Sequence, residues 1–213
     1  MNEERTAALQ EKVSRLDFHE PEREFLLEQL SRIEPKHGFR GLLFQGSDEN
    51  VRKHLGSAAA ERFKDFMSGF EPPKRFAMGS AQTFFLMNAC AASLWSPWGR
   101  YADGAFADVR AWVQEVSENP IMQLLRTGFE RNLAELFLLE AEAVQRLTNF
   151  GEIRAQAVSS HEVQLRLEDN YAALFAPVIA GAAAGVLELA QVKGEVHQEL
   201  DPDLDEALVS IRW

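Results

Sequence analysis

Residues 151–168, GEIRAQAVSSHEVQLRLE, decide the fold class of this chain. Apolar and polar residues alternate over Glu152–Val158 and again over His161–Glu168, on either side of Ser159-Ser160. Alternation with a period of two is typical of strands that bury one face, and a two-residue polar connection is typical of a hairpin. We therefore predict two antiparallel strands in this stretch.

The chain beyond this hairpin predicts a helix and two further strands. The helix is expected over Pro177–Ala190, with Pro177 in its first turn and the small residues Gly181–Gly185 forming a slim packing surface. Val192–Gln198 alternates weakly, and Ala207–Trp213 alternates clearly. The last third of the chain is thus predicted to run strand, strand, helix, strand, strand, with the terminal tryptophan packed on the helix.

Upstream of the hairpin, apolar residues recur at helical spacing. Residues 1–34 are predicted to form charged amphipathic helices. The most apolar helix is expected over Phe76–Trp95, and another long one over Pro120–Leu147. The glycine-bracketed segment Gly38–Gly46 fits either a buried strand or the start of a helix, because its period alone does not separate the two.

Together these patterns predict an α+β fold, in which a mostly helical body precedes a C-terminal ββαββ unit with a small antiparallel sheet. We expect N-terminal amphipathic helices over 1–34 and a single domain over 35–213, with the helical body at 35–150 and the ββαββ unit at 151–213. The 213 residues are enough for one sizeable core.

Composition and charge narrow the class of function. Hydrophobic residues make up 46% of the chain and charged residues 26%, which are values of an ordinary globular protein. The net charge of −11 repels phosphate backbones, and no basic stripe offsets it. We therefore expect no nucleic-acid partner.

The compartment is predicted from cysteine usage and from the apolar runs. The single cysteine, Cys90, cannot form an internal disulfide, which fits a reducing compartment. The first residues lack the pattern of a signal peptide. The most apolar segment, Tyr171–Leu187, contains two glycines and a proline, so we read it as a buried helix and expect no membrane span. The protein is predicted to be cytoplasmic.

Motifs for catalysis and metal binding are missing from the sequence. The histidines are spread along the chain without ligand spacing, and there is no nucleophile elbow and no phosphate-binding glycine loop. Cys90 lies in an apolar run without a basic residue beside it in the sequence, which favours a small buried hydrophobe over a reactive thiol. We predict no catalytic residue, no metal site, no cofactor and no enzymatic activity.

A cluster of aromatic residues is the best candidate for a ligand-binding or partner-binding site. Such residues line ligand pockets and interface hot spots, and they also build ordinary cores, so both interpretations stay open. The candidates in the helical body are Trp95, Trp98, Tyr101, Phe106 and Trp112, and Tyr171 is added from the C-terminal unit.

Acidic residues gather late in the chain, over Glu195–Glu206. Charge blocks of this kind are most often solvated, so we predict an exposed turn between strands. A site for a cation or a basic partner is the alternative.

Several segments resemble a family of uncharacterised paralogous proteins restricted to myxobacteria. They are Phe39–Gly46, Arg62–Phe66, Trp98–Tyr101, Ala107–Val113 leading into Ser117–Pro120, and the closing strand that ends at Trp213. The family is a domain of unknown function, so the resemblance implies no activity. The chain departs from it at Asn170–Pro177, where the family has a proline-rich entry with a histidine.

The predicted layout is also similar to haem-nitric-oxide-binding and vinyl-reductase-like small-molecule-binding domains, at the level of fold. Haem binding of that type implies a proximal histidine on a body helix. Residues 57–160 contain no histidine, so we expect that haem does not bind.

The sequence therefore predicts a non-catalytic cytoplasmic module that binds a protein partner or a small apolar ligand, with a role in signalling or regulation. The alternative is a sensor of a small molecule or cofactor with its pocket in the helical body. An enzyme of unrecognised chemistry ranks third, and homo-oligomerisation stays open.

Overall fold

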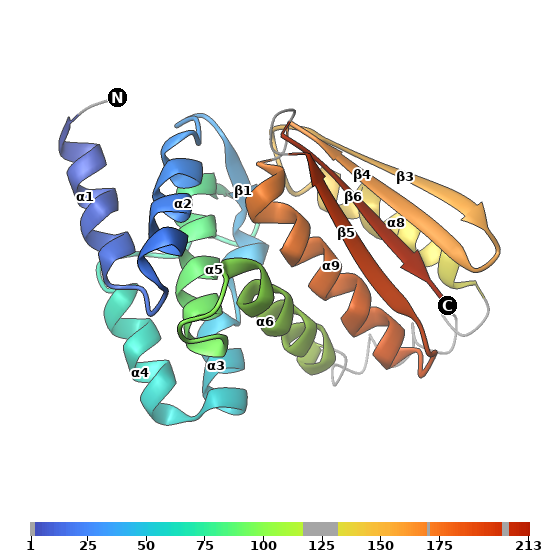
Figure 1. Ribbon diagram of the computed structural model, residues 1–213, viewed down its shortest axis with the longest axis horizontal. Coiled ribbons are helices and arrows are strands. Elements are labelled where there is room, and N and C mark those ends of the chain that lie inside the picture. The colour runs from blue at the N-terminus through green and yellow to red at the C-terminus, as the bar shows by residue number, and fades with distance from the viewer. Residues whose placement is uncertain (1–2, 117–131, 170, 202–204) are drawn as a thin grey trace. The chain divides into compact units, whose positions relative to one another are not determined.

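The computed structural model describes residues 3–116, 132–169, 171–201 and 205–213 (Figure 1). These residues form two compact units, Met1–Asp108 and Val109–Trp213, and the boundary falls within one helix.

The first unit is built almost entirely from helices. Its elements are α1 (Glu3–Ser14), α2 (Glu20–Ser31), β1 (Gly38–Arg40), the 3₁₀ helix η1 (Gly41–Phe44), α3 (Ser47–Leu55), α4 (Ser57–Phe66), β2 (Met78–Ser80) and α5 (Ala81–Trp95), followed by α6 (Tyr101–Val116), which continues into the second unit. The strands β1 and β2 pair antiparallel, with Phe39 opposite Gly79. The segment Gly38–Gly46, whose sequence fits either a strand or a helix, forms a short strand followed by a 3₁₀ helix.

The helix α5 forms the centre of this unit, because it is buried on nearly every side. Twelve of its fifteen residues are buried. The ring of Phe39 from β1 packs against Phe84 at 4.1 Å and against Phe85 at 5.4 Å between ring centroids. The side chain of Ser80 accepts a hydrogen bond from the backbone N–H of Thr83 and so caps the helix. The cap explains why α5 begins at Ala81, five residues later than Phe76.

Gly104 allows α6 to cross α5 closely. A Cβ atom at Gly104 would lie 2.1 Å from the carbonyl oxygen of Ala92 on α5. No side chain fits at that distance, so the position requires glycine for steric reasons.

The second unit contains a four-stranded antiparallel sheet with the strand order β3-β4-β6-β5. Its elements are α8 (Leu133–Gln145), β3 (Glu152–Ser159), β4 (Glu162–Glu168), α9 (Ala172–Leu189), β5 (Glu195–Asp201) and β6 (Glu206–Arg212). The α+β class and the ββαββ order are confirmed. Of the helix predicted over Pro120–Leu147, the residues 120–131 lie outside the described part, and α8 begins at Leu133.

Alternation places the apolar side chains of the sheet on one face. Val163, Leu165 and Leu167 of β4 are buried and lie beside Val209 and Ile211 of β6. Both α8 and α9 cover this face (Figure 1). The opposite face is charged and carries cross-strand ion pairs, such as Arg154 with Glu168 at 3.4 Å and Arg212 with Glu162 at 3.1 Å.

The start of α9 differs from the prediction for a physical reason. We expected Pro177 in the first turn, but the helix begins at Ala172 and Pro177 lies inside it. The carboxylate of Asp205, from the distant β5–β6 connection, accepts hydrogen bonds from the backbone N–H groups of Tyr171 (3.2 Å) and Ala172 (2.8 Å). This cap satisfies donors at the helix N-terminus and favours its dipole.

By length and composition α9 could cross a membrane. Its 18-residue window has a mean hydropathy of 1.9, but 72% of that window is buried inside the fold. A mostly buried apolar helix is what a core helix looks like, in agreement with the sequence-based interpretation of Tyr171–Leu187.

Gly185, one of the small residues of α9, packs closely against α6. A Cβ atom at Gly185 would lie 2.7 Å from Cβ of Val113, so this surface admits α6. Trp213 instead lies 5.7 Å from the ring of Phe137 on α8, and its backbone N–H donates to the carbonyl of His161. The indole is half-buried. The indole therefore packs on α8, and its expected packing on Gly181–Gly185 stays a prediction.

We predict that Trp213→Ala lowers the free energy of unfolding by about 1–3 kcal/mol. Truncation of a fully buried tryptophan costs about 3–5 kcal/mol, and this one is half-buried. Denaturant titration measures the change. Leu139→Ala, on α8 and 57% exposed, is the matched control and should shift the midpoint little. Equal midpoints for wild type and Trp213→Ala would contradict the packing of the indole on Phe137.

Candidate functional site

An apolar pocket in the helical unit is the site best shaped to hold a small molecule. It lies among η1, α3, α4, α5 and the segment that follows α4, and its volume is about 310 Å³. Its lining is dominated by phenylalanine and methionine: Phe44, Phe63, Phe70, Met67 and Met87, with Ser47, Asp48, Lys64 and Pro72 completing it.

The walls of this pocket are set by packing, and its rim is polar. Phe44, Phe63 and Met87 are buried, whereas Asp48 and Lys64 are exposed. The hydroxyl of Ser47 lies 3.7 Å from the sulfur of Met87, within reach of a weak hydrogen bond. Such a site can bind a small, mainly apolar molecule whose polar end faces the rim.

No pattern in the sequence marks the residues of this pocket as a site. Phe63 and Met67 share a helical face with Phe66 in the sequence, a pattern that predicts core packing and nothing more. Phe44 and Met87 come from other elements, and only the fold brings them together.

A buried carboxyl group forms the second notable feature of the unit. Asp108 of α6 is 6% exposed, and its Oδ1 accepts hydrogen bonds from the indole N–H of Trp95 (2.8 Å) and from the side-chain amide of Asn50 (2.8 Å). The same amide also donates to the backbone carbonyl of Asp108 at 3.0 Å. Burial raises the pKa of Asp108 to about 7, although both hydrogen bonds lower it.

The amide oxygen of Asn50 is buried without a hydrogen-bond partner among the described residues. A buried acceptor left unpaired destabilises the fold by about 1–3 kcal/mol. Asn50 lies one turn along α3 from Ser47 and Asp48, so the same helix contributes to the apolar pocket and to the Asp108 cluster.

Cys90 lies on another cavity of the helical unit, about 380 Å³ in volume, that also has Arg15, Arg62 and Asp65 in its lining. Burial raises the pKa of the Cys90 thiol to about 12, although Arg62 and Arg15 act to lower it. The expectation that Cys90 has no basic neighbour is thus wrong in space. Its expected character as an unreactive buried thiol agrees with this pKa.

The aromatic candidates of the helical body differ in burial and in their contacts. Trp95 is half-buried against Asp108 and His54, and Tyr101 is fully buried, which raises the pKa of its phenol. Phe106 is half-buried. Trp98 is 63% exposed, lies 5.6 Å from the ring of His19 and has a φ of +65°, in the left-handed region.

The remaining candidates belong to the second unit. Trp112 is half-buried on α6. Tyr171 is 8% exposed, packs on Phe150 at 5.3 Å and precedes α9 with a φ of +54°. Their roles as ligand-binding or partner-binding residues stay predictions.

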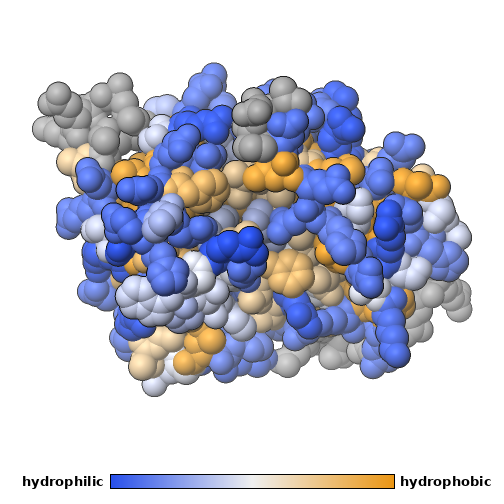
Figure 2. Space-filling model, in the orientation of Figure 1, coloured by the Kyte–Doolittle hydropathy of each residue, from blue (hydrophilic) through white to orange (hydrophobic). Residues whose placement is uncertain are grey.

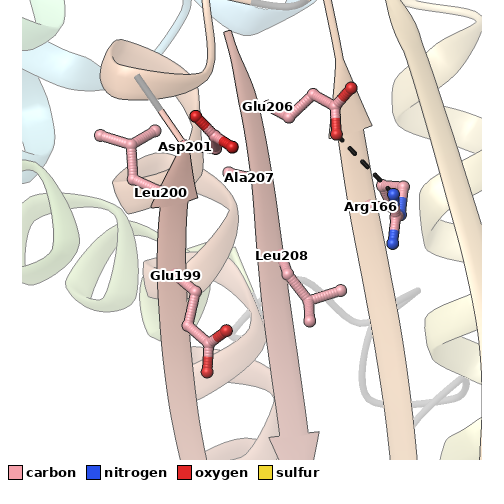
Figure 3. Close-up of a pocket in the computed structure, with 7 residues that line it drawn as sticks. All are labelled: Arg166, Glu199, Leu200, Asp201, Glu206, Ala207 and Leu208. Atoms are coloured by element: carbon pink, nitrogen blue, oxygen red, sulfur yellow. Dashed lines mark ion pairs between the residues drawn. The ribbon is translucent and has the colours of Figure 1, made fainter. Parts of the chain in front are cut away.

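The outer face of the sheet carries a shallow, charged pocket of about 280 Å³ (Figure 3). Arg166 and Glu206 in its lining form an ion pair at 3.7 Å. The other lining residues are Glu199, Leu200, Asp201, Ala207 and Leu208. The predicted turn over Glu195–Glu206 is wrong for its first part, because Glu195–Asp201 is the edge strand β5. Within the described ranges, no group of three or more His, Cys, Asp and Glu side chains is placed to hold a metal ion.

Known structures resemble the chain in fold. An H-NOX protein from K. algicida in the Fe(II) unliganded state is 10% identical, with a TM-score of 0.55, covering 81% of this chain and 95% of that one. An H-NOX protein from S. oneidensis in the Fe(II)NO ligation state is 14% identical, with a TM-score of 0.53, covering 81% of this chain and 98% of that one. No protein-family model and no curated protein matches. The chain has an H-NOX-like fold.

The described residues do not offer a haem site. Protein ligands of haem iron are typically histidine, cysteine thiolate, methionine or tyrosinate. Met67 and Met87 line the apolar pocket, but methionine holds haem iron together with a histidine, and no histidine lines that pocket. Four of the five histidines are exposed and His37 is half-buried, and none lines a cavity described above. Cys90 does line one, but its high pKa keeps the thiol neutral. Tyr101 is fully buried.

We predict that Asp108 makes the unfolding free energy depend on pH between about pH 4 and pH 7. In this window the folded protein holds the Asp108 proton that the unfolded chain releases, because the pKa rises from 3.8 to about 7 on folding. Stability from this group is therefore lost as the pH rises, by at most about 1.4 kcal/mol per pH unit, and the loss ends above pH 7.

Denaturant unfolding across this pH range compares wild type with Asp108→Asn, which keeps the acceptor oxygen but does not titrate. The slope should be shallower in the variant. Asp103→Asn, at an exposed position in the first turn of the same helix, should retain the wild-type slope. Identical slopes for wild type and Asp108→Asn would show that this carboxyl does not carry the effect.

We predict that haem does not bind specifically. Titration with hemin should give a weak absorbance change without saturation at one equivalent, because no described cavity offers an ionised or imidazole ligand. A sharp, stoichiometric Soret band would contradict the prediction, and its loss in Cys90→Ala would identify the thiol as the ligand.

Proposed function

We propose that this protein is a non-catalytic, cytoplasmic small-molecule sensor that binds a small apolar ligand in the pocket of its helical unit. The sequence predicts a sensor of a small molecule or cofactor as its alternative function. We propose this alternative, with a ligand that binds without a metal ion. Binding is the molecular function, and signalling or regulation is its expected consequence.

The observation that carries the proposal is the composition and size of the pocket. Its volume of about 310 Å³ lies at the lower end of the range of about 300–1,000 Å³ for ligand sites, which are mostly apolar with a few polar groups. Methionine adds to this, because its flexible thioether adapts to ligands of different shapes. Asp48 and Lys64 at the rim offer one charge of each sign to a polar end group.

The similarity in fold supports a ligand-binding role but does not identify the ligand. The similar structures are H-NOX proteins, described as Fe(II) unliganded or in an Fe(II)NO ligation state. At 10% and 14% identity, their ligands do not transfer to this chain, and the described residues favour an organic ligand over a haem.

Binding of a protein partner is the second candidate, and Trp98 favours it. Its indole is 63% exposed, while its backbone N–H donates to the carbonyl of Asp17 at 2.7 Å. A non-glycine residue with a positive φ destabilises the fold locally, and such residues concentrate at functional sites. An exposed tryptophan on a fixed turn is also the residue type that dominates interface hot spots.

We predict that the fluorescent apolar probe 1-anilinonaphthalene-8-sulfonate binds the native protein and that Met67→Trp weakens its binding at least tenfold. Met67 lines the pocket and is half-buried, so the larger ring fills the space without entering the core. Fluorescence titration measures the affinity, and a thermal melt establishes that each variant is folded.

Trp98→Ala is the matched control, because that ring lies outside the pocket lining. Its probe affinity should equal that of wild type. Saturable binding that Met67→Trp leaves unchanged, or no saturable binding by the folded wild type, would refute the pocket as the ligand site.

A further inference from the structure

Two exposed apolar residues lie two positions apart in the segment that leads into β2. On the face shown in Figure 2, hydrophilic residues predominate and apolar residues are scattered among them. Phe76 is 74% exposed and Met78 is 38% exposed, only two residues apart. We refer to Lys74, Arg75, Phe76, Ala77 and Met78 as the 74–78 tip; all five are exposed.

Cations surround these apolar groups. The guanidinium of Arg75 lies 5.6 Å from the centroid of the Phe76 ring, and Arg40 is the strand partner of Met78. Among the described residues, no carboxylate pairs with Arg40, Lys74 or Arg75. The nearest acid in the sequence is Glu71. In a chain of net charge −11, the tip is therefore a local basic and apolar exception.

Backbone hydrogen bonds hold the tip in one conformation. The N–H of Leu42 donates to the carbonyl of Arg75, and the N–H of Gly41 donates to that of Ala77, both at 2.8 Å. Arg40 donates from Nη1 to the carbonyl of Phe76 at 2.7 Å. A Cβ atom at Gly41 would lie 2.2 Å from the carbonyl oxygen of Lys74, so only glycine allows this approach.

We propose that the 74–78 tip docks the protein on an anionic lipid surface, with Phe76 and Met78 in the interfacial layer and Arg40, Lys74 and Arg75 at the headgroups. Aromatic and aliphatic side chains flanked by cations are the combination that binds the interface of acidic membranes. Because the tip is already ordered, little conformational entropy is lost on docking. The proposal is independent of the ligand pocket.

A lipid surface fits the tip better than an acidic protein does. A stable protein interface buries about 800 Å² on each partner, around a central pocket or anchor. The tip is a short run of five exposed residues, which suits insertion into a deformable interface. The negative charge of the rest of the chain makes the binding weak, reversible and oriented, with the tip toward the membrane.

Vesicle sedimentation tests the proposal with the full chain. The protein should pellet with vesicles of equal parts phosphatidylserine and phosphatidylcholine but not with phosphatidylcholine alone, and salt should release it. Lys74→Gln and Arg75→Gln should each weaken binding about fivefold, and Phe76→Ser about tenfold. Val158→Ser, which removes another half-exposed apolar side chain, should bind as wild type does.

A single label reports insertion directly. Ala77→Cys places an accessible thiol on the tip, while the native Cys90 is only 4% exposed, so a polarity-sensitive dye attaches at the tip. Its fluorescence should rise on acidic vesicles. Failure to pellet with acidic vesicles, or equal pelleting by wild type and the tip variants, would overturn the proposal. A dye response to polyglutamate and not to vesicles would assign the tip to an acidic protein instead.

Discussion

Burial of α5 on nearly every side is the constraint on which the helical unit depends. Twelve of its fifteen residues are buried, so neighbouring elements must cover its whole circumference. The features of the unit follow from that covering. Met87 closes the apolar pocket, Cys90 borders the charged cavity, and Trp95 holds the carboxyl of Asp108. A change in the packing of α5 would therefore alter all three sites together.

The polar groups buried beside α5 are destabilising by themselves. Asp108 is buried with two donors on its carboxylate, and Asn50 has an unpaired buried oxygen. An apolar replacement of the same shape would avoid both penalties. Buried polar groups with a raised pKa concentrate at functional sites, so this cluster supports the proposed ligand site that the same helix α3 lines.

The fold alone does not set the ligand of this chain. The layout of helices followed by an antiparallel sheet is similar to that of an H-NOX protein in the Fe(II) unliganded state, whereas the described cavities of this chain have phenylalanine, methionine and a neutral thiol in their linings. Such a difference is physically reasonable, because the backbone arrangement depends on which faces are apolar. The chemistry of a ligand depends on a few side chains that packing leaves free to vary.

The sequence by itself determined the α+β class and the ββαββ order, since period-two and helical patterns record which face each element buries. It also predicted that Cys90 is buried. It did not decide whether Gly38–Gly46 forms a strand or a helix. Only the tertiary structure decided the start of α9, which depends on Asp205 more than thirty residues later, and the seat of Trp213 on Phe137. The same holds for the apolar pocket, because its walls come from elements whose spacing in the sequence carries no information about their distance in space.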